Sequence, residues 1–240
     1  MAHLRHLGGA EQRRYVSALF TRISGRYDLM NDIMSLGLIR LWRADAAKTA
    51  LRGLEGPVLD VAAGTGALTG LLARRGAHVV GLDLTAPMLR RALARGNSSP
   101  TPPQFIVGDA FSLPFPDETF ATVTCAFGLR NMPEAFTPLR EMVRVLRPGG
   151  KAVTIEIMPP VEEMALAGGI MWMYLRKAVP FLGGLLARET RAYRYLSDSV
   201  ASFYTAEDLA ALMRDAGFTD VSFRRKSLGA VAIHVGTRPA

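Results

Sequence analysis

A glycine-rich turn between a short apolar strand and a helix is the feature of this sequence that most constrains its fold. Residues 57–61 read Pro-Val-Leu-Asp-Val, and they are followed by Ala-Ala-Gly-Thr-Gly and a helical segment at 68–75. Gly64 and Gly66 allow a sharp turn and let a ligand approach the peptide N–H groups without interference from a Cβ atom. The turn therefore predicts a nucleotide-binding strand–loop–helix unit.

Short apolar strands continue to alternate with helices after this turn. The expected strands are 77–83, 104–107, 119–126 and 151–157, and the expected helices between them are 87–95 and 134–146. This rhythm is typical of a Rossmann-like, doubly wound α/β fold, in which a mostly parallel sheet lies between two layers of helices. A helix at 207–215, capped by Thr205, precedes two strands at 218–226 and 230–236, which we expect to add an antiparallel C-terminal strand.

The length of 240 residues suits one large domain, and no internal repeat or low-complexity tract divides the chain. Hydrophobic residues make up 49% and charged residues 21% of the sequence, which fits a globular protein and excludes a disordered one. The parts expected within this single domain are an N-terminal helical lid (1–55), a cofactor-binding core (56–157), an apolar helical substrate cap (158–204) and a C-terminal helix with strands (205–240).

Three carboxylates accompany three successive strands. Asp83 ends the second strand, where it can accept hydrogen bonds from both hydroxyls of a ribose. Asp60, inside the first strand, suits the ammonium of a methionine moiety, and Asp109, after the third, suits an adenine amino group. A dinucleotide-binding site requires a third small residue three positions after the second glycine, and this chain has Thr69 there. Three interpretations of the turn compete: an S-adenosylmethionine site, an NAD(P) site, and glycines that only shape a turn. The pattern of carboxylates favours S-adenosylmethionine over NAD(P). The neighbours expected to complete this site are Thr65, Leu84, Ala110 and Ala126.

The charge and the cysteine content narrow the class of protein further. The net charge is +8, and only four of the 29 basic residues are lysine. This indicates either an arginine-rich background or attraction to an anionic surface, nucleic acid or lipid. The single cysteine, Cys125, excludes an internal disulfide and a cysteine-based metal site, and we expect no metal. The N-terminus lacks the apolar core of a signal peptide, so a cytoplasmic location is expected.

One strongly apolar segment, 164–186, accounts for much of the high mean hydropathy of +0.16. Arg176, Lys177 and Pro180 interrupt it near the middle, which argues against a transmembrane helix. Two interpretations stay open. The segment either forms buried core helices or forms a lid over the substrate mouth that touches the bilayer interface.

Several motifs together resemble the ubiquinone/menaquinone-biosynthesis C-methyltransferases of the UbiE/MenG type. Residues 20–43 resemble the N-terminal signature of that family, and Phe127-Gly128-Leu129-Arg130-Asn131 resembles its active-site motif. Residues 144–150, 193–199 and 232–236 are similar to its other signatures, so the resemblance covers about 16–238. The family usually has an acidic residue where this chain has Ala67, and often a serine where it has Ala126. The implied fold is that of a class I S-adenosylmethionine-dependent methyltransferase.

The resemblance implies methyl transfer from S-adenosylmethionine to a ring carbon of a prenylated quinol, with demethylmenaquinol favoured. Arg130 is then expected to stabilise the developing quinolate, although a salt bridge that shapes the loop is its competing role. Asn131 is expected to hold either the quinol oxygen or the adjacent loop. Tyr27 lies within one helical turn of Asp28 and Asn31, so this segment can close over the cofactor as a lid. Glu156 is either a substrate-facing residue or a salt-bridge partner.

The expected partners are the prenylated quinol and, transiently, the inner face of a membrane, with a homodimer left open. Nucleic acid is not expected, because the chain has no appended RNA-binding module and no lysine-rich arm. Two other functions compete: a methyltransferase for another lipid or phenolic molecule, and a non-catalytic subunit of a quinone-biosynthesis complex. The presence of Asp60, Asp83, Asp109 and Arg130 argues against the non-catalytic subunit.

Overall fold

Successive strands are added first on one side of the first strand and then on its other side. A computed structural model describes residues 9–53, 55–95, 99, 101–159 and 190–240. Within these residues seven strands form one sheet in the order β3-β2-β1-β4-β5-β7-β6. The strands are β1 Val58–Val61, β2 Val79–Asp83, β3 Gln104–Val107, β4 Phe120–Ala126, β5 Leu146–Ile157, β6 Thr219–Lys226 and β7 Val231–Thr237. Among these seven strands β7 alone runs opposite to the other six, which confirms the predicted sheet with an antiparallel C-terminal strand.

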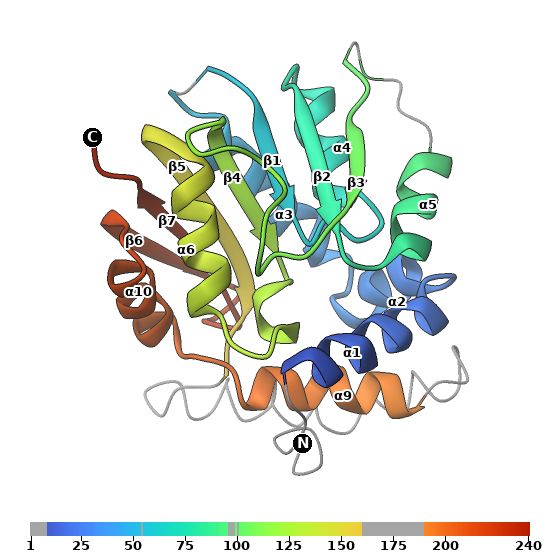
Figure 1. Cartoon of the computed structure of the whole chain (residues 1–240). Helices are drawn as coiled ribbons and strands as arrows, with labels where there is room; N and C mark the ends of the chain where they lie inside the picture. The colour runs from blue at the N-terminus through green and yellow to red at the C-terminus, as the bar shows by residue number, and fades with distance from the viewer. Residues whose placement is uncertain (1–8, 54, 96–98, 100, 160–189) are drawn as a thin grey trace.

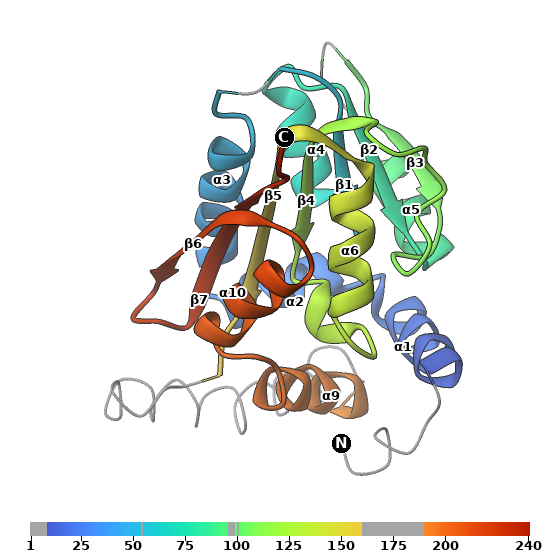
Figure 2. The same ribbon diagram turned by 60° about the vertical axis from the view of Figure 1, so that its left-hand side comes forward.

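Helices cover both faces of the sheet, as Figure 2 shows for α3 and α6. On one face α3 (Leu38–Ala50) and α4 (Ala67–Arg74) pack in one hydrophobic cluster with β1 and β5. On the other face α6 (Phe136–Val145) and α10 (Ala206–Asp215) form a second cluster with the sheet. The remaining helix of the core, α5 (Ala86–Ala94), packs against β2 and β3. Coverage on both faces explains why β1 and β4 are buried along nearly their whole length.

Three further helices, α1 (Gly9–Ile23), α2 (Tyr27–Met34) and α9 (Thr190–Ala201), lie across the carboxyl ends of the strands (Figure 1). They share a small apolar cluster that includes Leu19, Met30 and Leu196, so residues from both ends of the chain cover the same edge of the sheet. Most of the expected apolar cap 158–204, including the segment 164–186, lies outside the described residues. Among the residues that the structure does describe, no helix is long and apolar enough to cross a membrane.

The chain winds outward from β1 to β2 and β3, and then returns to β4 on the other side of β1. Such a switch point leaves a crevice at the carboxyl ends of the strands, where α/β proteins bind ligands. Beside it Ala62 and Phe127 have positive φ angles of 56° and 59°, which non-glycine residues rarely adopt. A Cβ atom at Gly128 would lie 2.6 Å from the Cβ of Ala62, so only glycine fits there. Two of the seven non-glycine residues with positive φ in the described part of the chain thus lie at this crevice.

The predicted boundaries differ from the structure mainly at β5, which begins at Leu146 and not at residue 151. Leu146 pairs with Phe120 of β4, and the register shifts before Lys151 pairs with Thr122. Residues 146–150, which precede the expected strand, are therefore part of β5. The predicted cap of α10 is confirmed, because the Thr205 hydroxyl oxygen accepts a hydrogen bond of 3.1 Å from the Asp208 N–H.

Candidate cofactor-binding and active site

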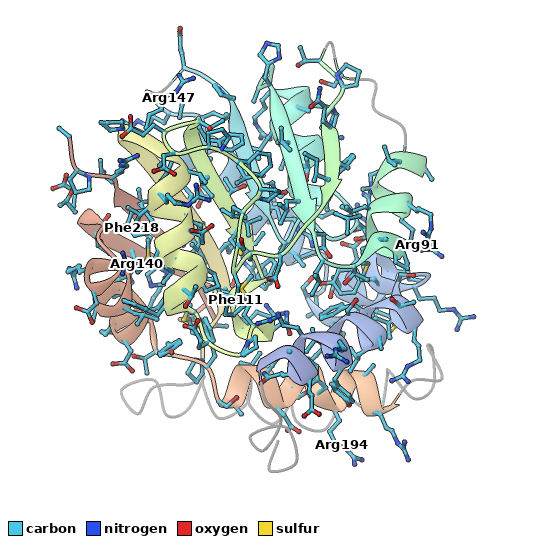
Figure 3. All side chains as sticks on the ribbon, viewed as in Figure 1. Arg91, Phe111, Arg140, Arg147, Arg194 and Phe218 are labelled. Carbon is cyan, nitrogen blue, oxygen red and sulfur yellow. The ribbon has the colours of Figure 1, made fainter. Side chains whose placement is uncertain are left out.

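A cavity opens at the carboxyl ends of the central strands and is covered by α1 and α2. Phe111, in the segment after β3, lies between these strand ends and α1 (Figure 3). The wall on the sheet side consists of Ala62, Gly64, Leu82, Asp83, Leu84, Thr85, Gly108, Asp109, Ala110, Phe111, Ala126, Phe127 and Gly128. The remaining wall includes Arg13, Val16, Ser17 and Phe20 of α1, Tyr27 of α2, Met88 of α5, and Asn131, Met132 and Pro133.

Asp83 is held rigidly at the end of β2 by two backbone N–H groups. Gly64 donates to Oδ2 at 2.8 Å, and Thr85 donates to Oδ1 at 2.7 Å. Burial raises the pKa of this carboxyl, and the two N–H donors partly offset that effect. A carboxylate oxygen can accept a second hydrogen bond, so each oxygen retains capacity for a ligand hydroxyl. The predicted ribose ligand is therefore positioned in the wall of the cavity.

Asp109 occupies another part of the same wall, and its carboxylate meets the N-terminal helix. Its Oδ1 accepts a hydrogen bond of 3.0 Å from the Phe111 N–H, which orients the side chain. Its Oδ2 lies 3.2 Å from Nε of Arg13, whose guanidinium also lies 4.9 Å from the centre of the Phe111 ring. Arg13 thereby ties α1 to the loop after β3. No local pattern in the sequence indicates this contact, because Arg13 and Asp109 lie almost a hundred positions apart.

Asp60 lies behind the cavity wall rather than in it. It is 1% exposed, and its two oxygens accept hydrogen bonds from the hydroxyls of Thr69 at 2.6 Å and Thr124 at 2.7 Å. Burial raises the pKa of Asp60 to about 6, against these hydrogen bonds, which lower it. Because Asp60 does not line the cavity, it acts on a ligand there only through the electric field of its carboxylate.

The residues of the glycine-rich turn divide between binding and packing. Gly64 lines the cavity, and a Cβ atom there would meet no atom within 4 Å. Gly66 does not line it; a Cβ atom at Gly66 would lie 2.8 Å from the Cβ of Ala92, so this glycine lets α5 pack closely against the turn. Thr65 is buried, and its hydroxyl donates to Asp28 of α2 at 2.8 Å. The turn thus serves as the attachment point of the lid helix.

Arg130 and Glu156 form a buried ion pair beside this cavity. Nη1 of Arg130 lies 2.7 Å from Oε2 of Glu156 and also donates to the Phe127 carbonyl at 2.9 Å. The side chains are 6% and 0% exposed, and burial raises the pKa of Glu156. Glu156 is thus a salt-bridge partner, the second of the two roles considered for it. Nε of Arg130 and Oε1 of Glu156 have no hydrogen-bond partner among the described residues.

Arg130 lines a second, adjacent cavity instead of the first. This cavity lies between α1, α9 and the short 3-10 helix η2 (Leu129–Asn131), and Tyr195 of α9 forms part of its wall. Burial raises the pKa of Tyr195 to about 12, partly offset by the charge of Arg130. Met132 and Pro133 line both cavities, so the two are separated by this one segment.

The residues around the first cavity fit a nucleoside-bearing cofactor. Asp83 and Asp109 offer acceptors at the ends of two successive strands, as hydroxyl and amino groups of an adenosine require. Nδ2 of Asn131 donates to the Phe127 carbonyl at 3.0 Å, but its Oδ1 is buried without a partner in the described part of the chain. An unsatisfied buried acceptor at the wall is suited to a donor group on a ligand.

The structure therefore brings most of the predicted site residues to one cavity. The predicted residues that line it are Tyr27, Gly64, Asp83, Leu84, Asp109, Ala110, Ala126 and Asn131. Those that do not line it are Asp60, Thr65, Gly66 and Arg130. A further residue with no predicted role, Arg43 of α3, has its guanidinium carbon 5.8 Å from the centre of the cavity-lining Phe127 ring. Arg43 lies at helical spacing from Ile39 and Ala46, which are both buried, and this spacing is the feature of the sequence that indicates an inward-facing position.

Comparison with known proteins assigns the family. The model of the ubiE/COQ5 methyltransferase family matches residues 8–238. A demethylmenaquinone methyltransferase of Thermus thermophilus is 42% identical over 92% of this chain and its own full length. A ubiquinone/menaquinone biosynthesis C-methyltransferase UbiE of Desulfotalea psychrophila is 40% identical over 93% of this chain and 90% of its own.

Solved structures agree on the fold. An S-adenosylmethionine-dependent methyltransferase from Thermotoga maritima superposes with a TM-score of 0.66 at 20% identity, covering 93% of this chain and 99% of its own. Its fold matches the layers of sheet and helices described above. Since the family model spans nearly the whole sequence, the chain belongs to the ubiE/COQ5 methyltransferase family and is a methyltransferase with the class I fold.

Proposed function

We propose that this methyltransferase transfers a methyl group from S-adenosylmethionine to a ring carbon of a prenylated quinol, converting demethylmenaquinol to menaquinol. The observation that carries the proposal is the pair of adjacent cavities. One offers carboxylates that suit a nucleoside, and the other offers a buried arginine, Arg130. The names of the relatives, demethylmenaquinone methyltransferase and UbiE, support this choice of acceptor.

The donor would lie in the first cavity. Asp83 would accept hydrogen bonds from the ribose hydroxyls, and Asp109 from the adenine amino group, while Leu84 and Ala110 would pack beside the nucleoside. When bound, S-adenosylmethionine supplies an electrophilic methyl group on a sulfonium, so the protein needs no nucleophile of its own. Tyr27 and the rest of α2 would cover the cavity and exclude water from it.

The chain's own residues would align the acceptor and make its ring more nucleophilic. Alignment of two reactants contributes roughly 7–11 kcal/mol in well-oriented systems. The Arg130 guanidinium, held by Glu156, would stabilise negative charge on the quinol oxygen next to the reacting carbon. Because an arginine stays protonated, the hydroxyl proton would pass to water or a carboxylate. As the ring carbon takes the methyl group and S-adenosylhomocysteine leaves, that carbon would release its own hydrogen as a proton, and one proton would return to the oxygen to restore the aromatic quinol. Asn131 lines the first cavity, and its free Oδ1 would accept a hydrogen bond from a group of the methyl donor.

The prenyl tail requires an apolar path, for which we propose the segment 164–186. Its Met, Trp and Phe side chains would receive the tail and touch the inner face of the membrane, with arginines such as Arg191 and Arg194 near anionic headgroups. Replacing Trp172 and Phe181 by serine should then reduce both liposome binding and activity on long-chain quinol. Unchanged liposome binding and activity in this double variant would contradict that role.

The acceptor is tested by incubating the protein with methyl-labelled S-adenosylmethionine and either demethylmenaquinol or its benzoquinol counterpart. We expect label in menaquinol. Label in the benzoquinol product alone would change the ring type, and label in neither would overturn the quinol proposal. Calorimetry that shows no S-adenosylmethionine binding would instead favour a non-catalytic subunit of a quinone-biosynthesis complex.

A further inference from the structure

Tyr195 of α9 has a buried ring and a hydroxyl without a protein partner. The residue is 5% exposed, and it forms part of the wall of the second cavity. Its ring meets the ring of Tyr15 of α1 edge to face, with 6.2 Å between the ring centres, which holds the side chain in place. Within the part of the chain that the structure describes, its hydroxyl makes no hydrogen bond. Because buried tyrosine hydroxyls usually have a partner, this one indicates a ligand in the cavity.

Other polar side chains of the second cavity are already engaged. The buried Ser199 hydroxyl donates to a carbonyl of its own helix at 2.8 Å, and the Glu134 carboxylate accepts a hydrogen bond of 3.1 Å from an N–H in the first turn of α6. Among the described residues that line this cavity, Tyr195 and Arg130 therefore combine a nearly buried polar side chain with hydrogen-bonding groups that are still free.

Arg130 and Tyr195 differ in what they can offer a ligand. The hydrogen bonds of Arg130 to described residues are all made by Nη1, and its buried Nε has no partner among them. Tyr195 belongs to α9, which contacts η2, the element that carries Arg130. Burial raises the pKa of Tyr195 to about 12, so its hydroxyl keeps its proton at neutral pH. The cavity thus presents a permanent cation from one element and a neutral hydrogen-bond donor from another.

The rest of the wall suits a flat ring between these two groups. Phe203 and Tyr204 form an edge-to-face pair with 5.4 Å between the ring centres, and Met132 adds an apolar contact. A few polar groups on an apolar wall fix the orientation of a bound ligand. In a quinol the oxygen beside the reacting carbon becomes negative during methyl transfer, whereas the oxygen across the ring stays a hydroxyl. The first oxygen requires a cation such as Arg130, and the second requires a neutral partner such as Tyr195.

We propose that the Tyr195 hydroxyl donates a hydrogen bond to the quinol oxygen remote from the reacting carbon, while Arg130 acts on the oxygen beside that carbon. This inference rests on the proposed function and deepens it, because it makes Tyr195 a specificity-determining residue for rings with two oxygens in para positions. A ring bound at both oxygens cannot turn in its plane, so one ring carbon faces the methyl donor. A site built to bind a hydroxyl rejects an analogue without it, because its own polar group is then left unpaired.

The test compares two acceptors in the wild type and in Tyr195→Phe. One is a demethylmenaquinol with a short prenyl chain, and the other is 3-prenyl-1-naphthol, which is the same molecule without the remote hydroxyl. With saturating S-adenosylmethionine, we expect the substitution to lower kcat/KM for the quinol by about 3- to 10-fold, the effect of one neutral hydrogen bond. The value for the naphthol should stay within about twofold. The naphthol ring is also less electron-rich, so the change in the ratio of the two values on substitution measures the contact.

The matched control is Tyr15→Phe. Tyr15 is 39% exposed, packs on Tyr195 and lines neither cavity, so loss of its hydroxyl should change neither kcat/KM value. Equal losses for both acceptors in Tyr195→Phe, or no loss for either, would overturn the role of Tyr195. Donor affinity in Tyr195→Phe should equal that of the wild type, because Tyr195 does not line the donor cavity.

The wild-type protein gives a second reading that does not depend on the folding of a variant. In complex with S-adenosylhomocysteine, it should bind the naphthol about 3- to 10-fold more weakly than the quinol in anaerobic calorimetry. Equal affinities would contradict the inference. Wild-type protein that methylates neither acceptor would overturn the proposed function itself, which is a distinguishable result.

Discussion

At the scale of single residues, the buried pair of Arg130 and Glu156 combines a structural and a proposed chemical role. Removing one member of a buried ion pair typically costs about 3–5 kcal/mol, whereas replacing both members by apolar residues is often neutral. Glu156→Leu would leave Arg130 charged and unpaired, since an arginine does not deprotonate. We therefore expect this variant to lose about 3–5 kcal/mol of unfolding free energy, as measured by urea denaturation.

The double variant Arg130→Leu/Glu156→Leu separates the two roles. Most of the unfolding free energy lost in Glu156→Leu should return, because neither charge is left buried. Methyl transfer should be absent, because Arg130 is missing. A double variant that is as unstable as Glu156→Leu would contradict the assignment of the cost to an unpaired charge. Restored activity in that variant would contradict the chemical role of Arg130.

Asp60 makes stability depend on pH. Burial raises its pKa to about 6 in the folded protein, from an ordinary value of 3.8. A raised carboxyl pKa means that the folded state holds its proton more tightly, so ionisation between pH 4 and 6 destabilises the fold. The difference between about 6 and 3.8 corresponds to a penalty of about 3 kcal/mol, fully present above pH 6.

Asp60→Asn removes this titration. The unfolding free energy of the variant minus that of the wild type should therefore rise by about 3 kcal/mol between pH 4 and pH 7, measured by urea denaturation without ligand. A difference that does not change with pH would show that Asp60 has an ordinary pKa.

At the scale of elements, α2 is attached to the cofactor loop through one carboxylate. Asp28 accepts a hydrogen bond from Thr65 at 2.8 Å and pairs with Arg95, which follows α5. Exposed or half-exposed ion pairs contribute up to about 1 kcal/mol. We expect Asp28→Asn to speed amide hydrogen exchange in residues 27–34 and to weaken donor binding by about fivefold, with little change in global stability.

The matched control for this lid is Asp32→Asn on the same helix. Asp32 pairs with Arg40 of α3, whose side chain is 76% exposed. Its replacement removes the same charge but leaves the contact with Thr65 intact. Equal effects of the two variants would show that helix stability, and not the attachment to the cofactor loop, controls the lid.

The elements most accessible to prediction were those bounded by local signals. Apolar runs ended by glycine or proline located the strands, and Thr205 marked the start of α10. Two features could not be predicted from the sequence. They are the ion pair of Arg13 with Asp109 and the position of Arg130 outside the donor cavity. Both depend on how α1 and α9 cross the edge of the sheet, and no local periodicity specifies that crossing. The burial of Asp60 behind Thr69 and Thr124 is likewise a product of packing between elements.

At the scale of the whole molecule, the net charge of +8 should draw the protein to anionic membranes. Arg191 and Arg194 are exposed on α9, and Figure 3 shows Arg194 on the side of that helix away from the sheet. A basic residue near an anionic surface contributes about 1 kcal/mol. Arg191→Gln/Arg194→Gln should therefore reduce binding to phosphatidylglycerol vesicles by roughly tenfold, measured by vesicle sedimentation in low salt.

The control carries the same change of charge elsewhere. Arg74 and Arg75 are exposed at the end of α4, at the opposite edge of the sheet, and Arg74→Gln/Arg75→Gln should have a much smaller effect. Binding should also decrease as salt shortens the range of the attraction. Equal effects of the two double variants would indicate a general charge effect without an oriented membrane face.

The central claim is that two adjacent cavities divide the work, with the donor held at Asp83 and the acceptor acted on by Arg130. The most direct test measures donor affinity and the methyl-transfer rate constant with demethylmenaquinol for Asp83→Ala and Arg130→Lys. We predict that Asp83→Ala weakens donor binding by about 10- to 100-fold, from lost hydrogen bonds to a charged group. Arg130→Lys should leave donor affinity unchanged and lower kcat by about 100-fold or more. Unchanged donor affinity in Asp83→Ala, or a loss of donor affinity in Arg130→Lys with normal kcat, would contradict this division.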